Sequence, residues 1–508
     1  DAEGALVFNR RAYAFAPAEG EKAFAAIDRL LTKAGRPAER VALYRGALDY
    51  RVAADERLAT LVAIAALEET ELGDVPAAID TYREALEVDE RDARPVENLA
   101  RLYATAGRFA DLAEHTRRRA EQAALPEEEA KLRLELGVLL EERLGDVSGA
   151  IDEYEAVVGL VDPQGDGPGK GAVARLEALV PGAEHKAQVL DLLRPLYEKA
   201  DDWRALVRVN TERLGLAQTP GEKVALHHET ARLWETRGDD RGRAFEAMRD
   251  AFAEDPDDGA TREELERLAL ATERWDDLAA AYEVGITRGS ELTRRELLLA
   301  LAKLHDQRRD DPRKALDAYV RLTELDETDI APYDAMVTLA TLLSDWPALV
   351  RALAKRAELV PDDEGRASTW RRIGEARRDM LDDAAGAIQA YERALELEPG
   401  SAFTVDCLID LYEQKNDAAR LVDLYRRRVE LADAEDEDLK LRLLLDAARR
   451  YEEGLGDRRE AIAQLVLALE VRPGVADVIR KLDELYTSEK MWPELLANLR
   501  EQAAAAAE

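Results

Sequence analysis

The sequence predicts an all-α fold, a solenoid made of stacked pairs of helices. Two observations support this prediction. The composition is that of amphipathic helices, because Ala, Leu, Glu and Arg dominate while Gly and Pro number 29 and 18 among 508 residues. In addition, two different segments recur along the chain with one common period of about 72 residues, and such self-similarity is typical of helical repeat proteins.

The first recurring segment centres on an Asp that is followed four positions later by an Ala. The copy at residues 72–86 returns at 144–154 and around Asp383, and weaker copies lie elsewhere in the chain. The aligned alanines are Ala78, Ala150, Ala244, Ala315, Ala387 and Ala461. Their spacings are 72, 94, 71, 72 and 74 residues, so one interval is exceptional.

The second segment alternates with the first and has a bulky residue followed three positions later by Leu. The bulky residues are Phe109, Trp203, Trp275, Trp346 and Trp492, with Pro37 and Ala418 at this place in two further copies. Their spacings, 72, 94, 72, 71, 72 and 74 residues, contain the same single exception. A period of 72 residues divides into two units of about 36, the length of one helix-turn-helix repeat.

Local chemistry explains the markers of the first segment. Each Asp can cap the free N–H groups that open the second helix, which stabilises it by about 0.5–2 kcal/mol. These residues are Asp74, Asp146, Asp240, Asp311, Asp383 and Asp457. Gly73, Gly145 and Gly456 suit a left-handed end of the preceding helix. The aligned Ala lets two antiparallel helices approach closely. The tyrosines four residues later are spaced to cover the seam with the next repeat, namely Tyr82, Tyr154, Tyr319 and Tyr391.

These residues resemble the tetratricopeptide family. In its second helix the family has a small residue, an aromatic residue four positions on, an Ala three later and often a Pro five after that. All four places are matched by Ala387, Tyr391, Ala394 and Pro399. Two further copies match except for Met or Leu in the aromatic place (Ala244, Met248, Ala251, Pro256; Ala461, Leu465, Ala468, Pro473). The Leu-Gly pair of the family's first helix is resembled by Leu136-Gly137 and Ile373-Gly374.

The resemblance covers roughly residues 20–502 and implies a right-handed superhelix of about thirteen repeats with a concave inner face. Alternate repeats depart from the family pattern, because they carry Leu where the family prefers Ala. We expect the two helices of those repeats to lie further apart. The residues are Leu112, Leu206, Leu278, Leu349, Leu421 and Leu495.

We divide the chain into an N-terminal segment (1–15), the solenoid (16–502) and an Ala-rich tail (503–508). The exceptional spacing places about 22 extra residues between Ala150 and Trp203, and we assign them to an insertion at about 160–182. We predict a surface loop and one short helix, Ala172 to Val180, with a partner-binding protrusion as the alternative. A phosphate-binding loop is excluded by Gln164 and Gly171, and an EF-hand by Val173 in the twelfth place.

The residues predict no catalytic, cofactor-binding or metal-binding site. The closest approach to a metal cluster is His227-His228-Glu229, but adjacent helical positions point about 100° apart. The single cysteine, Cys407, lies in an apolar helical stretch, and we interpret it as a small buried residue. The series of Trp residues is interpreted as core-edge packing at the start of each second helix rather than as a ligand track.

The formal charge of −35 excludes nucleic acid and anionic membrane surfaces as expected partners. No stretch is apolar enough for membrane insertion. We expect a cytoplasmic protein, although a cysteine-poor periplasmic or cell-envelope protein would have the same composition. The first residue is Asp1 rather than Met, as expected of a mature product or a fragment. The excess of Arg over Lys favours a GC-rich, bacterial genome.

We therefore predict a non-enzymatic scaffold that needs no cofactor and binds partner proteins along the concave face. One groove type of the family grips C-terminal carboxylates with Lys and Asn, but here only Asn98 falls on a first-helix inner face. That partner class is not supported, and the identity of the partners stays open. Two alternatives remain: an architectural spacer that associates with itself, and a regulatory arm of a larger multidomain protein.

Overall fold

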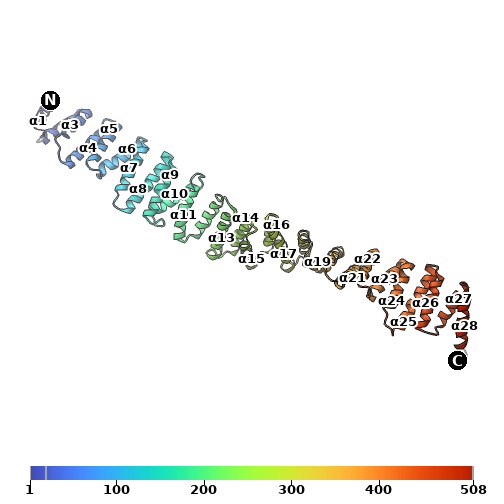
Figure 1. The fold of residues 1–508 in the computed structure, drawn as a ribbon. Coiled ribbons are helices and arrows are strands. Elements are labelled where there is room, and N and C mark those ends of the chain that lie inside the picture. The colour runs from blue at the N-terminus through green and yellow to red at the C-terminus, as the bar shows by residue number, and fades with distance from the viewer. Residues whose placement is uncertain (1, 18–19, 506–508) are drawn as a thin grey trace. The chain divides into compact units, whose positions relative to one another are not determined.

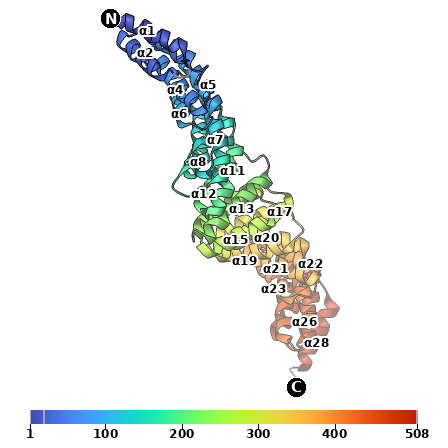
Figure 2. The same cartoon turned by 90° about the vertical axis from the view of Figure 1, so that its left-hand side faces the viewer.

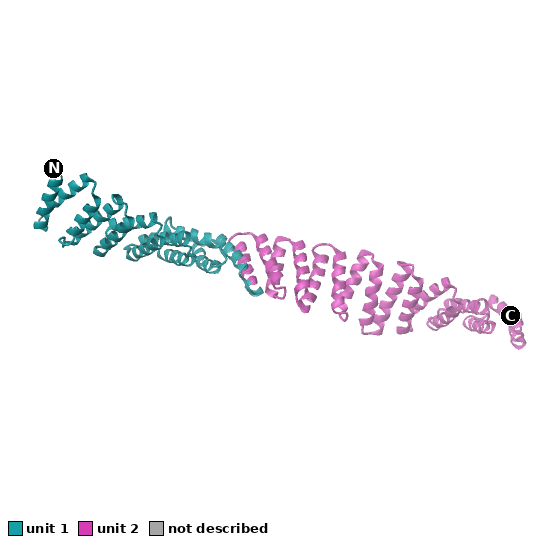
Figure 3. Cartoon of the chain, turned by 90° about the horizontal axis from the view of Figure 1, so that it is seen from above, with its two compact units in different colours: residues 1–222 teal, residues 223–508 magenta. Residues whose placement is uncertain are grey.

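The computed structural model describes residues 2–17 and 20–505, which form twenty-eight α-helices and no β-strand (Figure 1). The predicted all-α fold is confirmed. The chain divides into two compact units, residues 1–222 and residues 223–508 (Figure 3). Each unit is a series of helices in which neighbours along the chain pack on one another.

The first unit begins with α1, which lies beside α2 (Figure 2). Its helices are α1 (Ala2–Phe15), α2 (Glu21–Ala34), α3 (Pro37–Ala47), α4 (Ala54–Thr70), α5 (Val75–Val88), α6 (Ala93–Thr105), α7 (Phe109–Gln122), α8 (Pro126–Leu139), α9 (Val147–Leu160), α10 (Pro168–Leu179), α11 (Lys186–Ala200) and α12 (Trp203–Leu214). A π-helical turn, η2 (Leu140–Leu144), continues α8.

The second unit contains the remaining helices, of which α13 starts at the boundary between the units. They are α13 (Pro220–Thr236), α14 (Arg241–Glu254), α15 (Gly259–Thr272), α16 (Trp275–Arg288), α17 (Glu291–Gln307), α18 (Pro312–Leu325), α19 (Ile330–Leu343), α20 (Trp346–Leu359), α21 (Asp363–Asp379), α22 (Ala384–Leu397), α23 (Ala402–Lys415), α24 (Ala418–Glu430), α25 (Glu437–Arg449), α26 (Arg458–Val471), α27 (Ala476–Ser488) and α28 (Trp492–Ala505). The π-helical turn η3 (Arg450–Gly454) continues α25.

Successive helices form hairpins, and the turn of each hairpin contains one residue in the left-handed backbone conformation. These residues are Gly35, Gly73, Gly107, Gly145, Asp201, Asp239, Glu273, Asp310, Ser344, Asp382, Asn416, Gly456 and Lys490. The glycines among them have φ between 61° and 70°. Glycine adopts these angles without steric strain, because it has no Cβ. The left-handed turns predicted at Gly73, Gly145 and Gly456 are confirmed. Asp239, Asp310 and Asp382 adopt the same conformation without a glycine.

The six aspartates of the first recurring segment cap the second helices, as predicted. Each side chain accepts a hydrogen bond from a backbone N–H in the first turn of its helix, with donor–acceptor distances of 2.8–3.2 Å. For example, Asp383 accepts from the backbone of Gly386 at 2.8 Å. Because these bonds are local in sequence, the sequence pattern alone identified them.

Small residues bring the two helices of the Asp-capped hairpins together. The six aligned alanines are fully buried, with 0% of their surface exposed. In the α8–α9 hairpin the ring of Tyr154 lies over Gly137, where an added Cβ would be 2.5 Å from the ring. The Tyr154 hydroxyl donates to Glu141 at 2.6 Å. This ring therefore packs within its own hairpin, and the backbone of Gly137 leaves it room.

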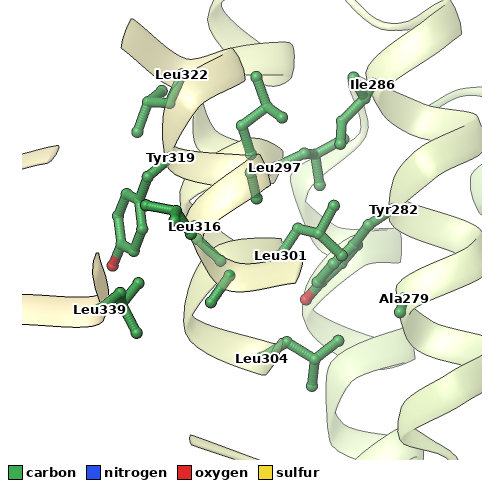
Figure 4. Close-up of a cluster of buried hydrophobic side chains, with 14 of the residues drawn as sticks. Ala279, Tyr282, Ile286, Leu297, Leu301, Leu304, Leu316, Tyr319, Leu322 and Leu339 are labelled. Atoms are coloured by element: carbon green, nitrogen blue, oxygen red, sulfur yellow. The ribbon is translucent and has the colours of Figure 1, made fainter. Parts of the chain in front are cut away.

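The tyrosines also reach the following hairpin, as the seam prediction requires. Figure 4 shows Tyr319 of α18 turned toward Leu339 of α19, and both belong to one buried cluster. In the same way, Tyr391 contacts Gly374 of its own hairpin and Cys407 of the next. One aromatic ring thus links three helices, which is how the stack builds a continuous core from units too small to have their own.

Two helices, α1 and α10, stand outside the hairpins. Helix α1 occupies the predicted N-terminal segment, and its Leu6 is buried against Ile27 and Leu31. At the other end, α28 continues into the predicted Ala-rich tail as far as Ala505, and residues 506–508 lie outside the described residues. The right-handed winding and the number of repeats implied by the resemblance stay predictions.

Candidate functional site

A recess of about 620 Å³ lies between the second helices of two successive hairpins in the first unit, α5 and α7, with α6 beneath it. We call it the α5–α7 pocket. Apolar side chains, among them Leu86, Val96 and Leu99, form part of its lining. Charged residues surround them, so the recess combines a small apolar surface with a charged rim.

Two of the arginines that line the α5–α7 pocket bond to other residues of the same pocket. Arg83 donates to the Tyr103 hydroxyl at 2.7 Å and to Asp111 at 3.0 Å. Arg118 donates to Glu114 at 3.0 Å. These exposed pairs each contribute little to stability. They connect the charged side chains at the rim of the pocket to one another.

A buried histidine forms one side of the α5–α7 pocket. Nε2 of His115 lies 3.0 Å from the carbonyl oxygen of Val96, on the neighbouring first helix. Burial lowers the pKa of His115 below its ordinary value, because the charged imidazolium would lose its hydration. The neutral side chain therefore links α7 to α6 and acts as a spacer.

A second pocket of about 400 Å³ occupies the equivalent place between α26 and α28, over α27. We call it the α26–α28 pocket. Every residue that lines it stands 383 positions after a residue of the α5–α7 pocket; Leu469 follows Leu86, and Asn498 follows His115. The hydrogen bond is repeated as well, since Asn498 donates from Nδ2 to the carbonyl oxygen of Ile479 at 3.3 Å.

The residue at the place of His115 and Asn498 differs from one copy to the next, with Leu43, Val209 and Leu424 in three of them. Ala281 on α16 and Ala352 on α20 occupy the place of His115 and Asn498, and both alanines are buried. Helix α14 packs directly against α16. At Ala281 the small side chain goes with direct packing of two successive second helices, whereas His115 and Asn498 bond to the first helix and line a pocket.

Known structures similar to this chain are helical repeat proteins of low identity. No protein-family model matches the chain, and no curated protein matches it. MamA is 20% identical over 32% of this chain and 91% of its own, with a TM-score of 0.22. The C-terminal part of a TPR repeat-containing protein from Cytophaga hutchinsonii is 15% identical (50% and 98%, TM-score 0.23). YrrB, a TPR protein with an unusual peptide-binding site, is 14% identical (40% and 98%, TM-score 0.23).

The likeness to these structures is one of fold alone, and the hairpins of the chain itself decide the assignment. Outside the insertion, successive left-handed turn residues follow one another at intervals of 34 to 40 positions. In the hairpins of the first recurring segment, which we call Asp-capped, each second helix places a fully buried Ala against its partner. The chain has a tetratricopeptide-type fold. Its hairpins alternate between the Asp-capped type and the Leu type, as the two sequence markers predicted.

The first helices of this tetratricopeptide-type array are linked by ion pairs across successive hairpins. Arg101 on α6 pairs with Glu69 on α4 at 2.6 Å. Arg267 on α15 pairs with Glu235 on α13, also at 2.6 Å. Asn98 donates to a backbone carbonyl of its own helix and accepts from Arg101. The Asn98 side chain is therefore held by bonds to residues of its own helix.

The insertion of the tetratricopeptide-type array is a packed helix with a short loop before it. Helix α10 begins at Pro168, four residues before the predicted start, and Ala172 and Leu176 have 0% exposure. Gly171 lies so close to α8 that an added Cβ would be 2.9 Å from Leu134. Helix α10 contacts α8, α9 and α11. The inserted helix thus packs into the stack of hairpins.

The remaining sequence candidates have structural roles. Cys407 is buried, as predicted, with its Sγ 3.6 Å from Nη1 of Arg378. His228 hydrogen-bonds to Thr261 at 2.6 Å. Across residues 2–17 and 20–505, no group of three or more His, Cys, Asp or Glu side chains is placed to hold a metal ion. In the same residues, no helix combines the length and apolar character needed to cross a membrane.

The Trp residues at the start of the Leu-type second helices are mostly half-buried, as core-edge residues should be. Trp275 and Trp346 pack against the large core cluster of the second unit. The guanidinium of Arg308, from the end of the next first helix, lies 5.3 Å from the ring centre of Trp275. Trp492 differs, because 56% of its surface is exposed.

Proposed function

We propose that this chain is a non-enzymatic scaffold that binds segments of partner proteins along its stack of hairpins. The observation that carries the proposal is the recurrence of one pocket at equivalent positions, 383 residues apart, with an apolar lining and a charged rim. Recesses of this kind hold single side chains. A partner that enters more than one of them gains affinity without any one contact being strong.

The physical logic favours extended partners. The hairpins are preformed and held by local caps and buried cores, so little ordering of the scaffold opposes binding. The concave first-helix face implied by the family resemblance is the other surface available to a partner. Some of its charged groups pair with each other, as Arg101 does with Glu69 and Arg267 with Glu235, and we therefore favour the pockets between second helices as the binding recesses.

Site-specific photo-cross-linking in the native cell tests the proposal. A photoreactive amino acid is placed at Glu87 or Glu470, each lining one pocket, and at Glu97, an exposed residue of first helix α6. We expect the pocket positions to capture the same protein reproducibly, and the purified pair to bind with defined stoichiometry. Capture at Glu97 alone would place the partner on the first-helix face. Absence of a reproducible partner from all three positions would refute the scaffold.

Deletion of residues 162–182 would remove α10, whose Ala172 and Leu176 are fully buried, and would damage the stack itself. A single exposed substitution such as Glu97→Gln leaves the packing intact and is the better matched control.

A further inference from the structure

The α26–α28 pocket carries three carboxylates that have no partner. Glu470, Glu494 and Glu501 line it, and among the described residues none of them forms an ion pair or a hydrogen bond. No Lys or Arg lines this pocket. Carboxylates gathered around one recess repel each other, and a cation placed among them would remove that repulsion.

The equivalent pocket of the first unit shows what the missing cations do. Arg83 stands at the position of Val466, and Arg118 at the position of Glu501. There the two guanidinium groups satisfy the carboxylates of Asp111 and Glu114. The α5–α7 pocket thus supplies arginines to Asp111 and Glu114, although among the described residues no bond is formed by its Glu87 and Glu90, whereas the lining of the α26–α28 pocket has no basic residue at all.

The shape and the remaining lining of the α26–α28 pocket suit a long basic side chain. Leu469, Leu482 and Ala497 provide an apolar surface for the methylene groups of such a side chain. The carboxylates of the pocket can then bind its charged group. Asn498 is held in place by bonds to the Ile479 carbonyl and, at 2.8 Å, to Asp483. The pocket wall is therefore fixed before a ligand arrives.

The electrostatic environment inside the pocket is negative. Burial raises the pKa of the Tyr486 hydroxyl, and the nearby charges of Glu494, Asp483 and Glu501 raise it further. The same field repels phosphate, so a nucleic acid or an anionic lipid does not fit this recess.

We propose that the α26–α28 pocket binds an arginine or lysine side chain of a partner protein. This inference rests on the proposed scaffold function and states the chemistry that one of its pockets recognises. An extended segment with a basic residue flanked by small apolar residues would place its stem on Leu469 and Leu482. Arginine is the better fit, because its planar guanidinium can bond to two carboxylates at once.

A photo-cross-linking peptide tests the proposal, because covalent capture detects the weak binding that a single pocket is expected to give. The probe is a biotinylated ten-residue peptide of Ala and Gly with one central Arg next to a photoreactive Leu. Its counterpart has citrulline, which has the same shape without the charge. We expect the Arg peptide to label α26–α28 up to about fivefold more than the citrulline peptide, because these ion pairs would be exposed to solvent. Equal labelling by the two peptides would overturn the proposal.

Two variants and a matched control locate the effect. The triple variant Glu470→Gln, Glu494→Gln, Glu501→Gln keeps the shape and should lose up to about fivefold in labelling by the Arg peptide. The double variant Val466→Arg, Glu501→Arg copies the first unit's pattern and should lose labelling too, because the pocket then supplies its own cations. The control replaces three exposed carboxylates outside the pocket, Glu435, Glu453 and Glu460, by Gln and makes the net charge less negative by the same amount as the triple variant.

The outcomes separate this proposal from the scaffold function. Labelling that falls as much in the control as in the triple variant would reduce the effect to general charge attraction and overturn the pocket assignment. If cellular partners are captured at Glu470 while the peptide shows no preference for Arg, the scaffold stands and the basic side chain is wrong. If no partner is captured anywhere, the scaffold itself fails. Circular dichroism of each variant confirms that the helices are retained.

Discussion

Substitution of Ala387 by Leu tests how closely the helices of an Asp-capped hairpin approach each other. Ala387 has 0% of its surface exposed, at the crossing of α22 with α21. Three extra carbon atoms in a fully packed site cost about 1–3 kcal/mol. Since about 1.4 kcal/mol corresponds to a tenfold change in an equilibrium constant, local opening of this hairpin should become roughly 5- to 160-fold more frequent.

Amide hydrogen exchange read by mass spectrometry measures this effect locally. It is preferred to whole-chain melting, because a long array of hairpins does not unfold in one step. Peptides from α21 and α22 should exchange faster by the factor above, while peptides from α8 and α9 should be unchanged.

The same substitution two residues away is the control. Ala385 lies on the exposed side of α22, and Ala385→Leu adds the same atoms to solvent. We expect it to change exchange by less than a factor of about two, since surface substitutions rarely exceed 0.5 kcal/mol. If Ala387→Leu and Ala385→Leu gave equal exchange rates, the explanation of the aligned alanines by close helix contact would be wrong.

Three further predictions follow from the caps, a buried tyrosine and the histidine spacer. Asp383→Ala removes an N-terminal cap and should speed exchange in the first turn of α22 by an amount equivalent to about 0.5–2 kcal/mol. Tyr154→Phe removes the 2.6 Å bond to Glu141 and should lower the urea midpoint of the first unit by an amount equivalent to about 1.5–3 kcal/mol; an unchanged midpoint would contradict that role. Burial lowers the pKa of His115, so below pH 6.5 the unfolded chain takes up a proton that the folded chain resists, and stability should fall until the folded pKa is passed. His115→Asn, which copies Asn498, should remove this part of the pH dependence in urea titrations at pH 5 and 7.

The features that could be predicted from the sequence are local or periodic. The Asp caps involve residues at most three positions apart, so Asp74 and its counterparts could be identified without knowledge of the fold. The glycine turns are equally local. The three equivalent turns at Asp239, Asp310 and Asp382 could not be predicted by the same rule, because there the two helices hold a residue with a Cβ in the left-handed conformation.

The pockets could not be predicted because they depend on distances between helices that are far apart in the sequence. His115 has no remarkable neighbours in the sequence, and its role as a spacer appears only when its bond to Val96 is known. Comparison of aligned positions across the repeats would have been the useful signal, since His115 and Asn498 stand where other copies have Ala281 and Ala352. The packing of α10 could not be predicted for a related reason, because a Gly-rich segment such as the one at its N-terminus is typical of a surface loop.

The α26–α28 pocket joins parts of two hairpins, because α26 belongs to one hairpin and α27 with α28 to the next. In an array where each hairpin contacts only its neighbours, a pulling force is carried by one junction after another. A side chain seated across such a junction adds a bond in parallel with the existing contacts. A bound partner would therefore stabilise this junction against a pulling force. The two hairpins that it connects would be among the last in the second unit to separate.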